Sequence, residues 1–317
     1  MDRPVMSVQA TVSTLFRVPA RHRTMRGWLR QPAVIGALLV APASIFLLIV
    51  FVAPALQMIV YSVTAKTTSG VMTEAFGFHN YARLIEVDLY RKVLLRTLRI
   101  ALITSVSAVP IAYPLAFVMV RGNPFWSRLV MLVVISPLLV LVVVRAYGWK
   151  LILAKTGLLN WALKGLGIAD DPPQILYTEW AVIIASVHVF LPFIVLPLAS
   201  AIGKVPISLE EAAQTLGADA RVVFWRIILP MSLPGLAVGV TLVFSLTAAS
   251  YVTPQLLGGN FTPMLGSLVE QQIFANNDWP FAAAIAAVLI VVTLTANLVF
   301  LRVVERRFRR WTAQRSG

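Results

Sequence analysis

Six apolar segments, each about as long as a bilayer is thick, constrain the fold of this chain more than any other feature. A transmembrane helix needs about 20 apolar residues, whereas membrane strands alternate apolar and polar residues. The chain is 59% hydrophobic and 13% charged, which is unlike a soluble domain. The sequence therefore predicts an all-α integral membrane protein with six transmembrane helices, at residues 33–61, 94–120, 128–149, 180–202, 235–257 and 281–301.

The distribution of basic residues predicts the orientation. An even number of spans places both termini on one side of the membrane, and that side holds seventeen of the 27 basic residues. Basic residues are enriched in cytoplasmic loops, so both termini are expected in the cytoplasm. The exception is the basic run Arg91–Arg99 on the opposite side, for which we expect an amphipathic helix on the outer surface, leading into the second span.

Beyond the six-span domain of residues 33–302, basic tails are expected at residues 1–32 and 303–317. The first tail has no short apolar core with a cleavage site, so it is interpreted as cytoplasmic rather than as a signal peptide. Because basic residues gather beside apolar runs, they favour lipid headgroups over nucleic acid as their partner.

The segment 203–234, between the fourth and fifth spans, is polar. Ser208 and Glu211 have the spacing of a capping box, which predicts a helix that begins at Ser208. This helix should end at Leu216, because Gly217 supplies the left-handed residue that often follows a helix.

A second short helix is expected to begin after Asp219, which can cap it, and to stop before Pro230. The segment is thus a helical hairpin that either lies on lipid as a connector or docks to a protein. An anionic lipid surface repels paired glutamates, and alanines anchor poorly in a membrane, so docking is favoured. The predicted apolar face of the first helix consists of Leu209, Ala212, Ala213 and Leu216.

The same segment carries a recognisable motif. Glu211-Ala212-Ala213 is followed after three residues by Gly217, and after nine more by Ile-Ile-Leu-Pro at 227–230. This pattern resembles the EAA loop of binding-protein-dependent ABC transporter permeases. Other stretches resemble the spermidine/putrescine-type subfamily: VRAYGW at 144–149, GLLN at 157–160, LPF at 191–193, YVTPQLLGG at 251–259 and WPF at 279–281.

The resemblance implies a multi-pass subunit of the bacterial inner membrane whose hairpin is a coupling helix, seated in a cleft of a cytoplasmic ATPase. It implies a second, similar permease, two ATPase subunits and an extracytoplasmic solute-binding protein as partners. The subfamily favours a polyamine as the solute, with another small solute as the alternative. The coupling residues that it implies are Glu210, Glu211, Ala212, Ala213 and Gly217.

The chain has no P-loop motif, so ATP and Mg²⁺ are expected in the partner ATPases, with no cofactor, metal or catalytic residue in this chain. Cysteine is absent, which excludes disulfides. The predicted spans contain no Asp or Glu, and such residues mark proton paths in coupled carriers. A stand-alone secondary carrier or channel is therefore the weaker alternative.

Several polar residues near the spans have two interpretations each. Arg145 either snorkels to the interface or contacts solute, and His188 either bonds a neighbouring helix or binds a ligand. Tyr147 and Trp149 fit an aromatic belt at the interface.

The stretch SYVTPQ at 250–255 is either an ordinary span end or a broken helix that lines a cavity. In the second case a polar solute pathway is lined by Ser250, Tyr251, Thr253 and Gln255. A polycation would meet no carboxylate inside a span, so its charge must be stabilised elsewhere. Candidates are the Tyr251 ring, through cation–π contacts, and mouth charges at Glu179 and Glu270.

Overall fold

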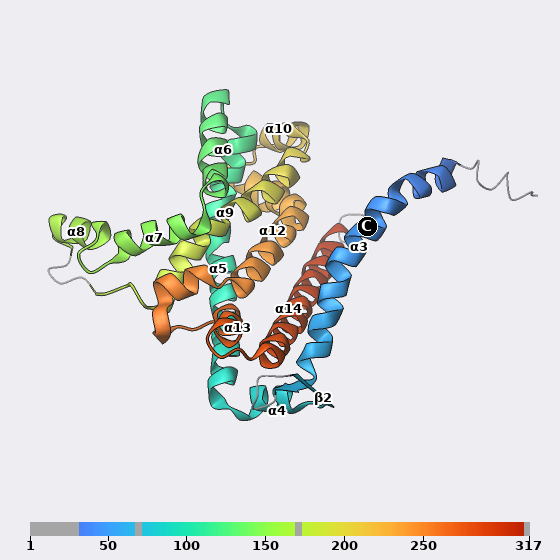
Figure 1. Ribbon diagram of the computed structural model, residues 1–317. Coiled ribbons are helices and arrows are strands. Elements are labelled where there is room, and N and C mark those ends of the chain that lie inside the picture. Colours follow the sequence, from blue (N-terminus) through green and yellow to red (C-terminus); the bar gives the residue numbers. More distant parts are fainter. Residues whose placement is uncertain (1–31, 67–71, 169–172, 314–317) are drawn as a thin grey trace, which may run out of the picture. The chain divides into compact units, whose positions relative to one another are not determined.

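The computed structural model describes residues 32–66, 72–168 and 173–313, and most of these are helical (Figure 1). The basic tail predicted at 1–32 therefore lies almost wholly outside the described residues. The elements are α3 (Pro32–Ser62), β1 (Thr64–Lys66), β2 (Met72–Phe76), α4 (His79–Glu86), α5 (Asp88–Arg121), α6 (Pro124–Leu139), α7 (Val142–Leu153), α8 (Leu158–Gly165), α9 (Glu179–Gly203), α10 (Ile207–Thr215), α11 (Ala220–Val223), η1 (Phe224–Ile228), α12 (Leu229–Ala249), η2 (Pro254–Gly258), η3 (Gly259–Phe261), α13 (Leu265–Phe274) and α14 (Trp279–Ala313).

Five helices are long and apolar enough to cross a membrane, and a sixth span is possible if a bent helix pair is counted as one. The helical membrane fold predicted from the sequence is confirmed.

The chain divides into two units, residues 1–57 and 58–317. The first contains most of α3, an apolar helix with Pro42 and Pro54 inside it. The five candidate spans are Leu39–Ser62, Asp88–Arg121, Glu179–Gly203, Ala220–Ala249 and Trp279–Arg306.

The third predicted span is not a straight helix. α6 ends at Leu139, and the helical chain that resumes at Val142 is bent away from it by 107°. Pro137 has no N–H to donate to the Val133 carbonyl, four residues earlier in the helix. This carbonyl instead accepts a hydrogen bond from the Ser136 hydroxyl at 3.0 Å. The helix can therefore end within an apolar run, where the sequence shows no polar break.

Three long helices form the core of the second unit. α5, α9 and α12 pack against one another through small and branched side chains, and α5 presents alanines to its neighbours. Small residues let membrane helices approach closely. At Gly239 of α12, an added Cβ would lie 2.8 Å from the Ile194 Cα, so this crossing requires glycine. Fully buried members of the core include Ile100, Ala108, Ala112, Ile194, Leu198 and Val243.

A second cluster joins α4, the first part of α5, the end of α12, α13 and α14. The rings of Tyr90 and Phe281 meet edge-on, 4.9 Å apart, and the Arg83 guanidinium lies 4.1 Å from the centre of the Phe281 ring. Arg83 also forms an ion pair with Asp278 at 3.2 Å. The β1–β2 hairpin, which was not predicted, is joined to α4 by Asn80, whose amide donates to the Ser62 and Thr64 carbonyls.

The basic run Arg91–Arg99 is helical and leads into the second span, as predicted, and its place on the outer surface stays a prediction. It lies in the first turns of α5, which continues without a break to Arg121. Its arginines form ion pairs: Arg91 pairs with Asp88 in the same helix, and Arg96 and Arg99 pair with Glu179 at the start of α9.

Candidate functional site

The polar hairpin between α9 and α12 begins one residue earlier than predicted. α10 starts at Ile207 with Pro206 in the capping position, and no side chain caps it. Ser208 and Glu211 therefore lie inside the helix, and the predicted capping box is wrong. A proline fixes its own φ, here at −61°, and Pro206 begins the helix without a side-chain cap.

The turn of the hairpin agrees with the prediction. Gly217 follows α10 with a φ of +84°, a conformation that strongly favours glycine. The Asp219 carboxylate accepts a hydrogen bond from the Val222 amide at 2.8 Å and so caps the next helix.

The predicted stop at Pro230 is wrong. The π-helical turn η1 links α11 to α12, closed by a hydrogen bond from the Leu229 amide to the Phe224 carbonyl. Pro230 lies where this turn passes into α12, and the helix continues through it. The second arm of the hairpin is thus continuous with a membrane span, so a movement of the hairpin would be carried directly into α12.

A half-buried ion pair joins the hairpin to the end of α5. Arg121 donates from Nε and Nη2 to the Glu210 carboxylate, at 3.1 and 2.8 Å. Arg121 Nη2 also donates to the Val205 carbonyl at 2.6 Å. The two side chains are only 14% and 13% exposed. Of the two adjacent glutamates, Glu210 therefore holds the hairpin in place, and Glu211 is exposed.

Exposed residues of α10 and of the turn that follows it are called here the docking face, and they include Leu209, Glu211, Ala212, Leu216 and Gly217. Leu216 is 89% exposed and Leu209 is 44% exposed. Glu211, Ala212 and Gly217 are exposed as well, whereas Ala213 is half-buried and packs against the core of the second unit. Leu209 and Leu216 are therefore apolar side chains that this chain by itself leaves uncovered.

The opposite end of α12 is a broken helix, one of the two alternatives that the sequence left open. α12 ends at Ala249, Ser250 is extended, and the chain re-forms a π-helical turn from Pro254 to Gly258. Tyr251 is 48% exposed and Gln255 is exposed, whereas Ser250 is half-buried. Thr253 is 1% exposed and faces the protein interior. Lining of a solute pathway by these residues stays a prediction.

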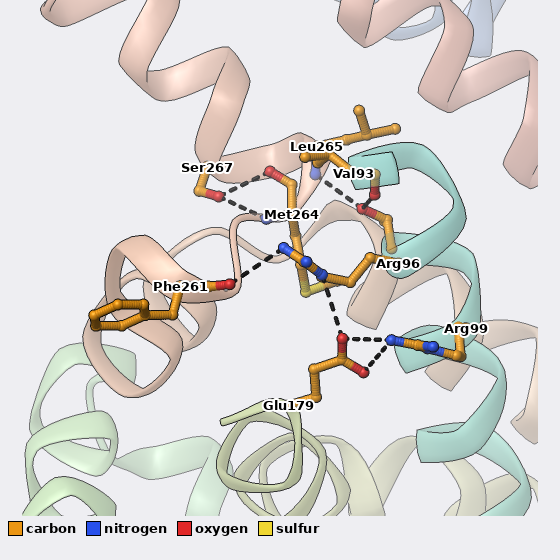
Figure 2. A network of polar contacts seen from close by, with 9 residues as sticks. Val93, Arg96, Arg99, Glu179, Phe261, Met264, Leu265 and Ser267 are labelled. Carbon is orange, nitrogen blue, oxygen red and sulfur yellow. Dashed lines mark hydrogen bonds and ion pairs between the residues drawn. The ribbon is translucent and has the colours of Figure 1, made fainter. Parts of the chain in front are cut away.

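At this same end, Figure 2 shows how α5 holds the loop after the broken helix. Arg99 and Arg96 both reach the Glu179 carboxylate, at 2.5 and 3.3 Å, and Arg96 donates to the Phe261 carbonyl at 3.3 Å. The Thr97 hydroxyl accepts from the Leu265 amide at 2.9 Å. Glu179, expected as an available mouth charge, is therefore already paired with two arginines.

The bent part of the third span contacts α9 through polar groups. Trp149 Nε1 donates to His188 Nδ1 at 3.2 Å, so His188 bonds a neighbouring helix, the first of its two interpretations. Arg145 lies on the same helix as Trp149, and its Nε and Nη1 atoms are buried without a hydrogen-bond partner among the described residues.

Comparison with known proteins gives consistent matches. The model of the family described as binding-protein-dependent transport system inner membrane component matches residues 22–310. The spermidine/putrescine transport system permease protein PotB of Salmonella typhimurium SL1344 is 35% identical over 249 residues, which cover 78% of this chain and 86% of PotB. PotB of Haemophilus influenzae is 35% identical over 272 residues, 83% of this chain and 95% of that protein.

A solved structure shares the fold. It is a chain of a bacterial alginate ABC transporter in complex with an alginate pentasaccharide-bound periplasmic protein. The TM-score is 0.73 at 19% identity, over 90% of this chain and 98% of that chain. This likeness concerns the arrangement of helices and carries no information on the solute.

Proposed function

Because the chain belongs to the family of binding-protein-dependent transport system inner membrane components, it is the permease subunit of an ABC importer, and we propose that its solute is a polyamine. The solute assignment is supported by the identity to the PotB proteins over most of both chains. We also propose the assembly: a second similar permease, two ATPase subunits that bind ATP and Mg²⁺, and an extracytoplasmic solute-binding protein.

The observation that supports coupling to an ATPase is the combination of a fixed hairpin and an open docking face. Arg121 and Glu210 attach the hairpin to α5, and the continuous helix from Ala220 to Ala249 attaches it to the core. Leu216 and Glu211 remain exposed for a partner. A rigid element of this kind can convert a movement of the ATPase into a movement of the spans.

The proposed orientation follows from this role. If the hairpin binds a cytoplasmic ATPase, then both termini are cytoplasmic, and the broken helix at Ser250–Gly258 lies at the outer face. A cysteine introduced at Gln214 should react with an impermeant thiol reagent only in inverted vesicles, and one at Gln271 only in intact cells. Reaction of both from the same side would refute the orientation.

The association with the ATPase is tested by copurification of a tagged chain in mild detergent. We expect the ATPase subunit to copurify with the wild type and to be lost with Leu216→Asp, which places a charge in the docking face. Ile168→Asp is the matched control, because Ile168 is also an exposed apolar residue, in the loop after α8. Equal recovery of ATPase with both variants would contradict the docking face.

One observation favours a second solute class. The partly unpaired Arg145 guanidinium, near His188 and Trp149, is suited to an anionic group rather than to an ammonium group. A ligand screen by thermal shift on the cognate solute-binding protein separates the two classes. Stabilisation by spermidine or putrescine supports the polyamine, and stabilisation only by acidic solutes supports the alternative.

A further inference from the structure

A cavity of about 560 Å³ opens beside the broken helix, at the end of the molecule opposite the hairpin. Its walls come from the broken helix, the loop that follows it, and α13. This volume is within the range of small-molecule sites, about 300–1,000 Å³. It is called here the mouth cavity, and its lining includes Gln255, Gly259, Pro263, Ser267, Glu270 and Phe274.

The loop that forms one wall of the mouth cavity is held firmly. Arg96 binds the Phe261 carbonyl, and Thr97 binds the Leu265 amide (Figure 2). The Ser267 hydroxyl donates to the Met264 carbonyl and accepts from the Met264 amide, so its own polar capacity is used within α13. The cavity is therefore bounded by a fixed loop, and the polar groups left for a ligand come from other residues.

Glu270 differs from Glu179 and Asp278, two other carboxylates at this end of the molecule. Glu179 is paired with Arg96 and Arg99, and Asp278 is paired with Arg83. In the described part of the chain, Glu270 has no basic partner and accepts one long hydrogen bond, 3.4 Å, from Gln255 Nε2. It is half-buried in the cavity wall. A carboxylate can accept about four hydrogen bonds, so most of its capacity is open.

We propose that Glu270 receives an ammonium group of the solute in the mouth cavity, before the solute enters the spans. A carboxylate without a cation, in a partly enclosed site, attracts an ammonium group more strongly than an exposed carboxylate does. Gln255 Nε2 lies 3.4 Å from the carboxylate, and the exposed Phe274 ring lies at the same cavity. A ring face there can bind an ammonium or methylene segment of the same solute.

This inference rests on the proposed polyamine function and deepens it, because it assigns the first contact of the solute with this subunit. The absence of carboxylates from the predicted spans makes such a contact useful. It concentrates the cation at the entrance without holding it inside the pathway.

The test uses the complete transporter in proteoliposomes, with its ATPase, second permease and binding protein, and with labelled spermidine as the solute. Glu270→Gln removes the charge but preserves the shape, and Glu270→Asp retains the charge. Glu86→Gln is the matched control, because Glu86 is an exposed carboxylate at the same end of the molecule, outside the cavity.

We expect Glu270→Gln to raise the KM for spermidine uptake about tenfold, which is the loss of one hydrogen-bonded charge contact. Glu270→Asp should recover most of the uptake, and Glu86→Gln should match the wild type. ATPase copurification should be unchanged in all three variants.

Two results would overturn the inference alone, while the wild type transports spermidine. One is an unchanged KM in Glu270→Gln. The other is an equal loss in Glu270→Gln and Glu86→Gln, which would indicate a general effect of surface charge. If the wild-type complex transports neither spermidine nor putrescine, the polyamine proposal itself fails, and this inference fails with it.

Discussion

Replacement of Arg121 by methionine should detach the hairpin from α5. The substitution removes the bonds at 3.1 and 2.8 Å to Glu210 and the 2.6 Å bond to the Val205 carbonyl. It leaves the Glu210 carboxylate, which is 13% exposed, without a cation. Breaking one side of a fully buried ion pair costs about 3–5 kcal/mol. Because both side chains retain some access to water, we expect a loss of about 2–3 kcal/mol in the free energy of unfolding.

The double replacement should be milder than either single one. With methionine at both Arg121 and Glu210 no unpaired charge remains, and apolar replacement of a buried pair is often nearly neutral. We therefore expect the double variant to lose only about 1 kcal/mol, so that a double-mutant cycle gives a clear coupling energy between the two positions.

The assay has two readouts. Unfolding in detergent measures the stability of each variant, and copurification measures binding of the ATPase. Both single variants should lose ATPase, because the hairpin no longer presents its docking face in a fixed position. If the stability losses of Arg121→Met and Glu210→Met add up to the loss of the double variant, the two side chains do not stabilise the hairpin as a pair. That result would refute the reasoning.

Substitutions at three further positions test other parts of the structure. Gly239→Ala should lower the free energy of unfolding in detergent by about 1–3 kcal/mol, because the added Cβ would press on the α9 backbone. An unchanged stability would contradict the close crossing of α9 and α12. Gly217→Val, at a φ of +84°, should cost about 1–2 kcal/mol and reduce ATPase copurification, and full copurification would show that the bend is dispensable. Tyr251→Ala should lower the spermidine uptake rate more than Tyr251→Phe, which retains the ring; equal losses would assign the effect to the hydroxyl.

Much of the fold could be predicted from the sequence, because a bilayer demands long apolar helices. The turn of the hairpin could also be predicted, because the left-handed Gly217 and the capping Asp219 are local features that depend on neighbouring residues in the chain. The errors at Ser208 and Pro230 were also local. Pro206 begins its helix without a side-chain cap, and a π-helical turn carries the chain past Pro230.

The features that sequence reasoning missed depend on the tertiary structure. Arg121 and Glu210 are 89 residues apart, and only the packing of α5 beside the hairpin reveals that Glu210 is an anchor. Likewise, the sequence alone made Glu179 and Glu270 equal candidates for a charge at the mouth of the pathway. In the structure the two differ, because Arg96 and Arg99 form ion pairs with Glu179 and not with Glu270.

The break in the third span was missed for a different reason. Val140 and Leu141, the residues of the break, are apolar, and nothing in their side chains distinguishes them from the helical residues around them. Pro137 was a weak signal, since many membrane helices contain proline without ending there.

The central claim is that this chain moves a polyamine only as the permease of an ATP-driven assembly. Its most direct test is uptake of labelled spermidine by proteoliposomes that contain the chain alone, the chain with the second permease and the ATPase, or the complete set with the binding protein. We expect uptake only with the complete set and ATP, and none by the chain alone under any ion gradient. Gradient-driven uptake by the chain alone would contradict the account and identify a secondary carrier.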